Sequence, residues 1–528
     1  MAAVAAAALV ASFLPASSAS ADIAPPYFAT TGNASDPHII ECTNPGFGGG
    51  TPVDGYCLYT SRDMGQSYAY PGNYYPMRYT RVYFSENGYS GWSFMGTAFN
   101  ESSLWVSNGG WVPDNAYHLW APAAVQNGSY YYLYVPDVSD ISNDSPPNSS
   151  TSSRIAVARS TTPFGPFTYL GTVPYSSGYM SDPDVLIDGS NRYLIWANGD
   201  NSSCGGLSTA RLNADMLTLV ANSTQTVTVN NIGALGNCGG TGRPYLEGAS
   251  LYKFNDSSMP GPYTLVFAAK PTTVPEQCTQ YWAGTGNAGT SYEVIAYATA
   301  STPQGPYTYK GIITCGSTTE WTNQASIVKV PNASGNARWM LVYHDAPGST
   351  KERKLHAECL LAGNGMIAGV YRQPLDGSGG FNDCMANVDA AYSAYAVNIG
   401  RFDGMTFVSA RSGGAQSLAI NRAAVGPWER FREYTLTNGN VAYRALANGK
   451  YLCASGQNEL QPSCTSSSDT TAQFVKVVSG NTFKLKAAAT GYWVRRWYYY
   501  TDDLYHLQPW GPTDSGDSMA AVFTKLEL

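Results

Sequence analysis

Short β-strands separated by turns are the feature that most limits what this chain can fold into. From about residue 24 to residue 373, runs rich in Tyr, Val, Ile, Leu and Trp alternate with stretches of Gly, Pro and Asn. Clear examples of such runs are 130–135, 192–196 and 338–344. The 3.6-residue periodicity of amphipathic helices is nearly absent. The sequence therefore predicts an all-β fold.

Similar elements recur along this region: a polar turn, a short strand, a loop and an aromatic strand. They open at intervals of 62 to 84 residues, near Asp36, Trp120, Asp182, Glu247 and Asn323. Five irregular all-β repeats predict a five-bladed β-propeller over 24–390. The related segments 162–167 (Thr-Pro-Phe-Gly-Pro-Phe) and 302–307 (Thr-Pro-Gln-Gly-Pro-Tyr) are each expected to close a blade in the same way. A β-sandwich would explain the alternation but not the repeated openings.

The character of the chain changes after a Gly-, Asp- and Ala-rich stretch at 374–394. Three further segments end alike, at Phe431, Phe474 and Phe523. Three repeats with a Phe near each end predict a β-trefoil over 395–528, with these Phe side chains in one core. The segments 426–431 and 448–452 resemble the fascin-like trefoils.

The composition and the N-terminal segment indicate which partners and which compartment to expect. Charged residues are only 13% of the chain and the net charge is -7, which argues against a protein that binds nucleic acid. Residues 1–21 are typical of a secretory signal, with an apolar run followed by Ala19-Ser20-Ala21, and the run is too short to span a bilayer. We expect a secreted monomer that does not bind a membrane.

Ten cysteines fit an oxidising compartment. Pairing neighbours along the sequence gives five candidate disulfides, although sequence alone does not fix connectivity. These are Cys42–Cys57, Cys204–Cys238, Cys278–Cys315, Cys359–Cys384 and Cys453–Cys464.

Three carboxylates stand at repeat openings: Asp36, Asp182 and Glu247. Glu247 lies between a Pro-bearing loop and a strand-like run, where solvent thins and a carboxyl pKa can rise, as a general acid requires. The first strands of propeller blades point into one central funnel, so distant acids can converge. Hydrolysis of a glycosidic bond with inversion needs such a pair of carboxyls, about 6.5–9.5 Å apart. Taken singly, however, Asp-Pro often starts a turn and a Glu in a turn is usually solvated.

The ordered set of motifs resembles glycoside hydrolase family 43 over about residues 25–375. Besides the three acids, the set comprises Trp120-Ala121-Pro122, 165–167, 212–216, 305–311 and 343–345. The resemblance implies Asp36 as general base, Asp182 as the residue that modulates the pKa of the acid, and Glu247 as general acid. It also implies that Trp120 stacks on a sugar face and that Arg353 contacts the sugar or the acid. A core Trp and a solvated loop cation are the alternatives for these two, and Lys354 competes with Arg353.

One departure from the family concerns a metal. Relatives usually carry a His, which often helps to hold a calcium ion or waters at the propeller axis, where this chain has Gln324. An amide can bind water but does not titrate and is a different ligand. The sequence therefore predicts no required cofactor, and axial calcium is the less favoured alternative.

The resemblance implies a secreted, exo-acting, inverting glycosidase that takes plant-type polysaccharides or oligosaccharides. Segments 295–299 and 305–311 look most like those of α-L-arabinofuranosidases and β-xylosidases. A β-1,3-galactan-type exo-galactosidase stays open, as does a carbohydrate-binding propeller that has lost turnover. A retaining fructan hydrolase ranks lower because Asp36-Pro37 is followed by His38. For the trefoil, Trp497 and Trp510 suggest polysaccharide binding, and simple packing against the propeller is the alternative.

Overall fold

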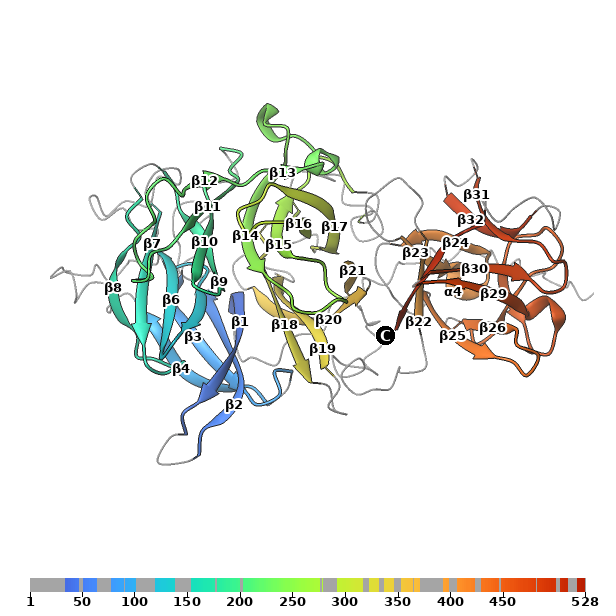
Figure 1. Ribbon diagram of the computed structural model, residues 1–528, viewed down its shortest axis with the longest axis horizontal. Coiled ribbons are helices and arrows are strands. Elements are labelled where there is room, and N and C mark those ends of the chain that lie inside the picture. Colours follow the sequence, from blue (N-terminus) through green and yellow to red (C-terminus); the bar gives the residue numbers. More distant parts are fainter. Residues whose placement is uncertain are drawn as a thin grey trace, which may run out of the picture.

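The computed structural model is nearly all β, as the sequence predicts (Figure 1). It describes residues 34–46, 51–63, 77–89, 91–100, 119–137, 153–175, 178–199, 203–275, 278, 292–316, 322–331, 337–345, 353–363, 365–370, 393–397, 406–422, 429–445, 448–480, 482–499, 504–510 and 520–527. The expected signal segment and most of 374–394 lie outside these residues. No helix in the described part is long and apolar enough to cross a membrane.

Residues 34–370 form five antiparallel sheets in chain order. Their strands are β1 (Ala34–Asn44), β2 (Val53–Asp63), β3 (Met77–Ser85) and β4 (Ser93–Asn100); β5 (Ala123–Asn127), β6 (Tyr130–Asp137), β7 (Arg154–Ser160) and β8 (Thr168–Thr172); β9 (Ser181–Asp188), β10 (Asn191–Ala197), β11 (Leu207–Arg211) and β12 (Gln225–Thr226); β14 (Tyr245–Tyr252), β15 (Tyr263–Lys270), β16 (Val294–Ala300) and β17 (Tyr307–Cys315); and β18 (Ala325–Pro331), β19 (Ala337–Asp345), β20 (Lys354–Gly363) and β21 (Met366–Val370). The short β13 (Val229–Asn230) adds in parallel to β17. Two short 3₁₀ helices, Ile232–Leu235 and Cys238–Gly240, precede β14.

The first strands of the five sheets, β1, β5, β9, β14 and β18, begin within three residues of the repeat openings read from the sequence. Side-chain hydrogen bonds link these strands around a ring. His38 accepts from Ala124 N (3.3 Å), and its other ring nitrogen lies 2.9 Å from Asp184 Oδ1. Asp184 Oδ2 accepts from Leu251 N (2.6 Å). The ring closes through Ser250 Oγ to Ala325 O (3.0 Å) and Ile39 N to Ser326 Oγ (3.2 Å).

Apolar side chains fill the space between neighbouring sheets. Tyr134 of β6 and Trp196 of β10 are fully buried in one such cluster. Tyr297 of β16 and Tyr343 of β19 are buried in another. The expected closing turns also match each other: Thr162 Oγ1 donates to Gly165 O (2.8 Å) and Thr302 Oγ1 to Gly305 O (2.6 Å). The resemblance between the two segments therefore reflects one shared turn.

Residues 393–527 form a separate twelve-stranded sheet (Figure 1). Its strands are β22 (Ser393–Val397), β23 (Thr406–Ala410), β24 (Leu418–Arg422), β25 (Arg430–Thr435), β26 (Val441–Ala445), β27 (Tyr451–Cys453), β28 (Gln461–Cys464), β29 (Phe474–Ser479), β30 (Thr482–Ala487), β31 (Val494–Tyr499), β32 (Leu504–Pro509) and β33 (Phe523–Glu527). A single helical turn, α4 (Arg411–Gly414), and a 3₁₀ helix, Thr470–Ala472, interrupt them. Phe431, Phe474 and Phe523 share one core, as the sequence predicts. Phe407 instead packs among residues of β1, β18 and β19 and so joins this sheet to the propeller.

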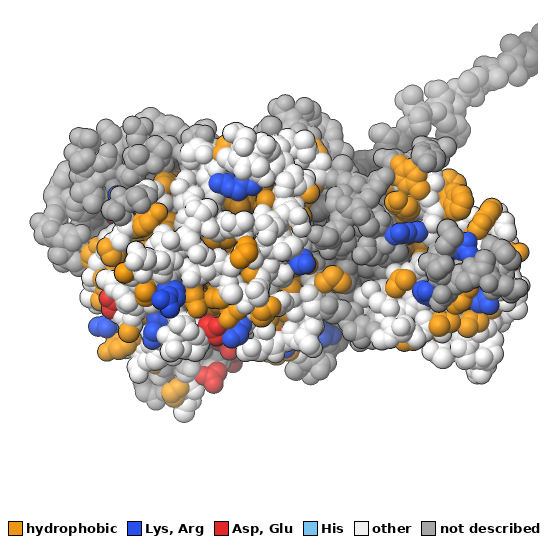
Figure 2. Space-filling model, turned by 45° about the horizontal axis from the view of Figure 1, so that its top comes forward, with side chains coloured by type: hydrophobic (Ala, Val, Ile, Leu, Met, Phe, Trp, Pro, Cys, Tyr) orange, Lys and Arg blue, Asp and Glu red, His pale blue; other side chains and the backbone are white. Residues whose placement is uncertain are grey.

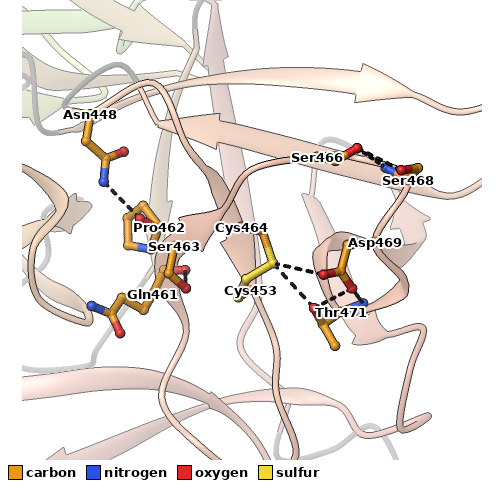
Figure 3. The surroundings of a disulfide bond; sticks show 10 residues. All are labelled: Asn448, Cys453, Gln461, Pro462, Ser463, Cys464, Ser466, Ser468, Asp469 and Thr471. Carbon is orange, nitrogen blue, oxygen red and sulfur yellow. Dashed lines mark hydrogen bonds between the residues drawn. A yellow bond between two sulfur atoms is a disulfide. The ribbon is translucent and has the colours of Figure 1, made fainter.

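Four of the predicted disulfides are present: Cys42–Cys57, Cys204–Cys238, Cys278–Cys315 and Cys453–Cys464. The last joins β27 to β28, and Thr471 Oγ1 lies 3.3 Å from Cys464 Sγ (Figure 3). The fifth predicted pair includes Cys384, which lies outside the described residues. The four bonds close loops of 11 to 37 residues and restrict the unfolded chain.

The ring around the propeller axis makes a testable contribution to stability. We expect Asp184→Ala to lower the free energy of unfolding by about 3 kcal/mol, because it leaves a buried His and a buried backbone N–H without their acceptor. Asp188→Ala is the matched control on the same strand: Asp188 pairs with the exposed Lys253 (2.7 Å), and we expect a loss below about 1 kcal/mol. Denaturant unfolding of both variants measures the difference. Equal losses would contradict a structural role for the ring.

Candidate active site

The three predicted acids lie near the N-terminal ends of three innermost strands, β1, β9 and β14. In each case the pairing with the next strand is irregular at the acid or the residue after it. Asp36 and Asp182 have left-handed backbones (φ 50° and 47°), and Gly248 follows Glu247 with φ 55°. A non-glycine residue in this region costs of order 1–3 kcal/mol, although Asp tolerates it better than most. Such irregularities redirect side chains at functional sites.

Asp36 is buried, with 4% of its surface exposed, and is held by Arg353. The guanidinium group of Arg353 contacts both carboxylate oxygens of Asp36, through Nη1 (3.0 Å) and Nη2 (3.2 Å). Ser35 Oγ lies 3.2 Å from Asp36 Oδ2. Two parallel charge-assisted hydrogen bonds hold the plane of a carboxylate in one orientation and are stronger than hydrogen bonds between neutral groups.

His344 supports the backbone of Asp36. Asp36 N donates to His344 Nδ1 (3.1 Å), and His344 Nε2 lies 3.0 Å from Thr322 O. These partners assign the tautomer with the proton on Nε2. Burial and the neighbouring Arg353 hold the pKa of His344 well below its usual range. The imidazole is therefore neutral and adds no positive charge beside Asp36.

Asp182 retains its proton at neutral pH. Burial is the main cause, and the negative charges of Glu247 and Asp36 add to it, so that the pKa of Asp182 is raised to about 8. Hydrogen bonds from Ser181 Oγ (3.0 Å) and Gly248 N (3.2 Å) to its carboxyl oppose this rise only in part. The bond from Gly248 connects Asp182 directly to the strand that carries Glu247.

Glu247 is the second carboxyl with a raised pKa, and burial is again the main cause. Tyr245 on the same face of β14 donates its hydroxyl to Glu247 Oε2 (2.5 Å). The neighbouring side chain of Glu293 and the charge of Lys270 both lower the pKa of Glu247, whereas the charge of Asp36 raises it. A carboxyl whose pKa is raised keeps its proton at a pH where most carboxyls have lost theirs, as a general acid requires.

The family model for glycosyl hydrolases family 43 matches residues 56–362, more than half of the chain and most of the five sheets that carry these acids. The chain belongs to this family. A xylosidase/arabinosidase from Bacteroides ovatus is 25% identical to it over 258 residues, which are 44% of this chain and 66% of that protein. The chain thus spans slightly less than two thirds of the relative's length.

Two solved family-43 structures are also similar. One, a β-xylosidase/α-arabinofuranosidase from a compost microbial metagenome in complex with xylotriose, has 22% identity and a TM-score of 0.45; the match covers 66% of this chain and 96% of that one. The other, a β-1,3-galactosidase, has 12% identity and a TM-score of 0.46, and the match covers 92% of this chain and 89% of that one.

The family's remaining expected positions lie at the same ends of the inner strands. Trp120 precedes β5, is partly buried, and its backbone N–H donates to Pro136 O (3.1 Å). Gln324 precedes β18 and is buried next to Gly248, since a Cβ on that glycine would come within 3.3 Å of Gln324 Cβ. Stacking of Trp120 on a sugar stays a prediction.

Arg353 contacts one of the three predicted acids, Asp36. Its five N–H groups are all engaged: Nη1 and Nη2 by Asp36, Nε (3.1 Å) and Nη2 (2.9 Å) by Asp63, and Nη1 by Thr322 Oγ1 (3.2 Å). Its side chain is only 3% exposed. These contacts place Arg353 against Asp36, and its contact with a sugar stays a prediction.

The residues at the axis do not fit a calcium ion. Asp184 is the only axial carboxylate in the ring described above, and its oxygens accept from His38, Val185 N and Leu251 N. In the described part of the chain no group of three or more His, Cys, Asp or Glu residues could hold a metal. Ca²⁺ needs six to eight oxygen ligands.

Several residues of this site were not predicted from the sequence: Asp63, Tyr245, Glu293 and Lys270. Asp63 ends β2, and the other three lie at one end of β14, β15 and β16. Asp63 has no local sequence signal that separates it from a solvated turn residue. Tyr245 could have been noticed, because it is two residues before Glu247 and therefore on the same face of the strand.

The raised pKa of Asp182 predicts a pH dependence of stability. Between about pH 4 and pH 8 the folded protein keeps a proton on Asp182 that the unfolded chain releases, so stability falls as pH rises and levels off above pH 8. Asp182→Asn removes this titration. We therefore expect the difference in melting temperature, variant minus wild type, to become more positive from pH 5 to pH 8. A constant difference would contradict the raised pKa.

Proposed function

We propose that the protein is a secreted, inverting exo-glycosidase that hydrolyses glycosidic bonds of plant-type polysaccharides, with α-L-arabinofuranosides and β-xylosides as its first candidate substrates. The observation that carries this proposal is that Asp36, which forms a salt bridge with Arg353, lies close enough to Glu247 for its charge to help burial raise the pKa of Glu247. Family membership and the B. ovatus xylosidase/arabinosidase support the substrate class. The four disulfides support secretion.

In the proposed mechanism Glu247 protonates the glycosidic oxygen as the bond to the anomeric carbon breaks. Asp36 accepts a proton from a water that attacks the opposite face of that carbon. Asp182 remains neutral at pH 7, so it does not add a third negative charge beside the acid. When Asp182 ionises, its negative charge opposes ionisation of Glu247, and we assign it the role of modulating the pKa of the acid in this way.

The stereochemistry of the product tests this function. The protein is incubated with p-nitrophenyl α-L-arabinofuranoside, β-D-xyloside and β-D-galactoside, and the released sugar is followed by NMR before it mutarotates. Inversion at the anomeric carbon of one substrate supports the proposal. Retention would instead support a nucleophilic Asp36, and turnover of the galactoside alone would support the galactan alternative. A pure, folded protein with no turnover on these or on natural oligosaccharides would support a propeller that only binds carbohydrate.

For the C-terminal sheet we propose a binding function on polysaccharide. Trp497 of β31 and Trp510, just after β32, are 44% and 37% exposed, and their ring centroids lie 5.5 Å apart. Exposed aromatic rings pack well against the C–H-rich faces of sugars. On the face in Figure 2, the charged side chains of the described residues lie singly or in small groups.

We expect the double variant Trp497→Ala and Trp510→Ala to bind insoluble xylan or arabinan about 10-fold more weakly, which is about 1.4 kcal/mol. Turnover of a soluble aryl glycoside should stay unchanged. Phe94→Ala is the matched control, because Phe94 is an exposed aromatic (54%) on the propeller. Point variants are preferable to deletion of the sheet, since deletion would expose the propeller residues that contact Phe407. Unchanged pull-down by the double variant would contradict this proposal.

A further inference from the structure

A second buried carboxylate shares the arginine that holds the proposed base. Asp63, the last residue of β2, is 1% exposed. Its Oδ1 accepts from Arg353 Nη2 (2.9 Å), and its Oδ2 accepts from Arg353 Nε (3.1 Å) and from Arg353 N (2.8 Å). The two aspartates therefore take two different edges of one guanidinium group.

Asp63 does more than neutralise the charge of Arg353. It anchors both the backbone and the side chain of Arg353, so the guanidinium plane cannot turn without breaking its two hydrogen bonds to Asp63. The edge left over, Nη1 and Nη2, then points at Asp36. Because a guanidinium group is rigid and planar, fixing one edge fixes the direction of the other.

Ser35 connects the two carboxylates a second time. Its Oγ lies 3.1 Å from Asp63 Oδ1 and 3.2 Å from Asp36 Oδ2. The register of β2 on β3 shifts between Ser61 and Asp63, and that of β1 on β2 shifts between Ser35 and His38. Asp63 thus lies at an irregularity of its own, beside the one that carries Asp36. Irregularities of this kind re-aim side chains.

We propose that Asp63 is a positioning residue for the base: through Arg353 it fixes the orientation in which Asp36 meets the attacking water. This inference rests on the proposed function of Asp36. Asp63 touches neither substrate nor water in this role, and it acts only as long as Asp36 is the proton acceptor. The titratable groups around Asp36 are Arg353, Asp63, Asp182, Glu247 and His344, of which Asp182 and His344 are neutral at pH 7.

The test is a double-mutant cycle with Asp63→Asn and Asp36→Asn, measured as kcat and KM on the best aryl glycoside. We expect Asp63→Asn alone to lower kcat at least about 10-fold with KM unchanged, since small misplacements of a reacting group carry large rate costs. In the Asp36→Asn background we expect Asp63→Asn to cause no further loss, because it acts only through Asp36.

The outcomes separate two failures. If Asp36→Asn keeps wild-type turnover, the proposed base is wrong. If Asp36→Asn loses turnover but Asp63→Asn lowers kcat by the same factor in both backgrounds, or leaves kcat unchanged, only the positioning role is overturned. Asp184→Asn serves as the control for general destabilisation, and its effect should be the same in both backgrounds.

A second variant keeps the proposal testable if Asp63→Asn does not fold. Ser35→Ala removes only the hydroxyl that joins the two carboxylates. We expect a smaller loss, about 3-fold, again confined to kcat and absent in the Asp36→Asn background. A loss confined to KM, or one that persists without Asp36, would overturn the proposal.

Discussion

Glu247→Gln is expected to lower kcat/KM on a natural oligosaccharide about 10³-fold, because the leaving sugar oxygen then receives no proton from the enzyme. On a p-nitrophenyl glycoside the loss should be much smaller, since p-nitrophenol leaves without much acid assistance. The dependence on leaving group is the signature of a general acid. Steady-state kinetics on the two substrates side by side measures it.

The control for this variant is Glu459→Gln. Glu459 lies in the C-terminal sheet, where its carboxylate pairs with His506 (3.1 Å), so the same chemical change should leave both rates unchanged. If Glu247→Gln lowers kcat/KM by the same factor on both substrates, Glu247 is needed for a purpose other than protonation of the leaving group. Glu293, a neighbouring side chain that lowers the pKa of Glu247, would then be the next residue to substitute.

Asp36→Asn is expected to lower kcat about 10³-fold on every substrate, whatever the leaving group, because activation of water is needed in each case. An amide also cannot form the double ion pair with Arg353, whose two contacts to Asp36 measure 3.0 and 3.2 Å. The loss should therefore appear in kcat and much less in KM. Single-substrate kinetics with at least two leaving groups measures it.

Asp188→Asn controls for this second change, because Asp188 lies on β9 with a surface Lys253 partner and takes no part in the site. It should keep wild-type kinetics. A loss in Asp36→Asn that varies strongly with leaving group would mean that Asp36 and Glu247 have exchanged roles. A fully active Asp36→Asn would remove the base from the proposed mechanism.

The pH dependence of activity should also differ between the wild type and Asp182→Asn. Activity requires a protonated Glu247, whose pKa burial raises, so activity should fall as the pH rises through that value. Asp182, with its pKa near 8, adds a negative charge beside the site above this pH. Because that charge opposes ionisation of Glu247, the alkaline fall in activity should move to lower pH in Asp182→Asn, which has no charge to add.

The amino-acid sequence was sufficient to predict the all-β class, the approximate positions where the inner strands begin, and three carboxylates that lie near those positions. It could do so because these are local signals: alternating apolar residues, turn residues, and carboxylates next to Pro or Gly. The four disulfides that the structure describes also join neighbours in sequence, as predicted. The shared core of Phe431, Phe474 and Phe523 followed from their repeated positions.

The tertiary structure alone decided how the acids are held. Asp63 lies 290 residues from Arg353 in the sequence, and the Arg353–Asp36 pair spans 317 residues, so no local pattern connects them. The same is true of the ring of His38 and Asp184, 146 residues apart. Charge and burial at a site depend on which side chains the sheets bring together, and these decide which carboxyl keeps its proton. For that reason the sequence predicts which carboxylates belong to the candidate site, whereas only the fold determines that Asp36 is paired with Arg353 and that Asp182 stays neutral.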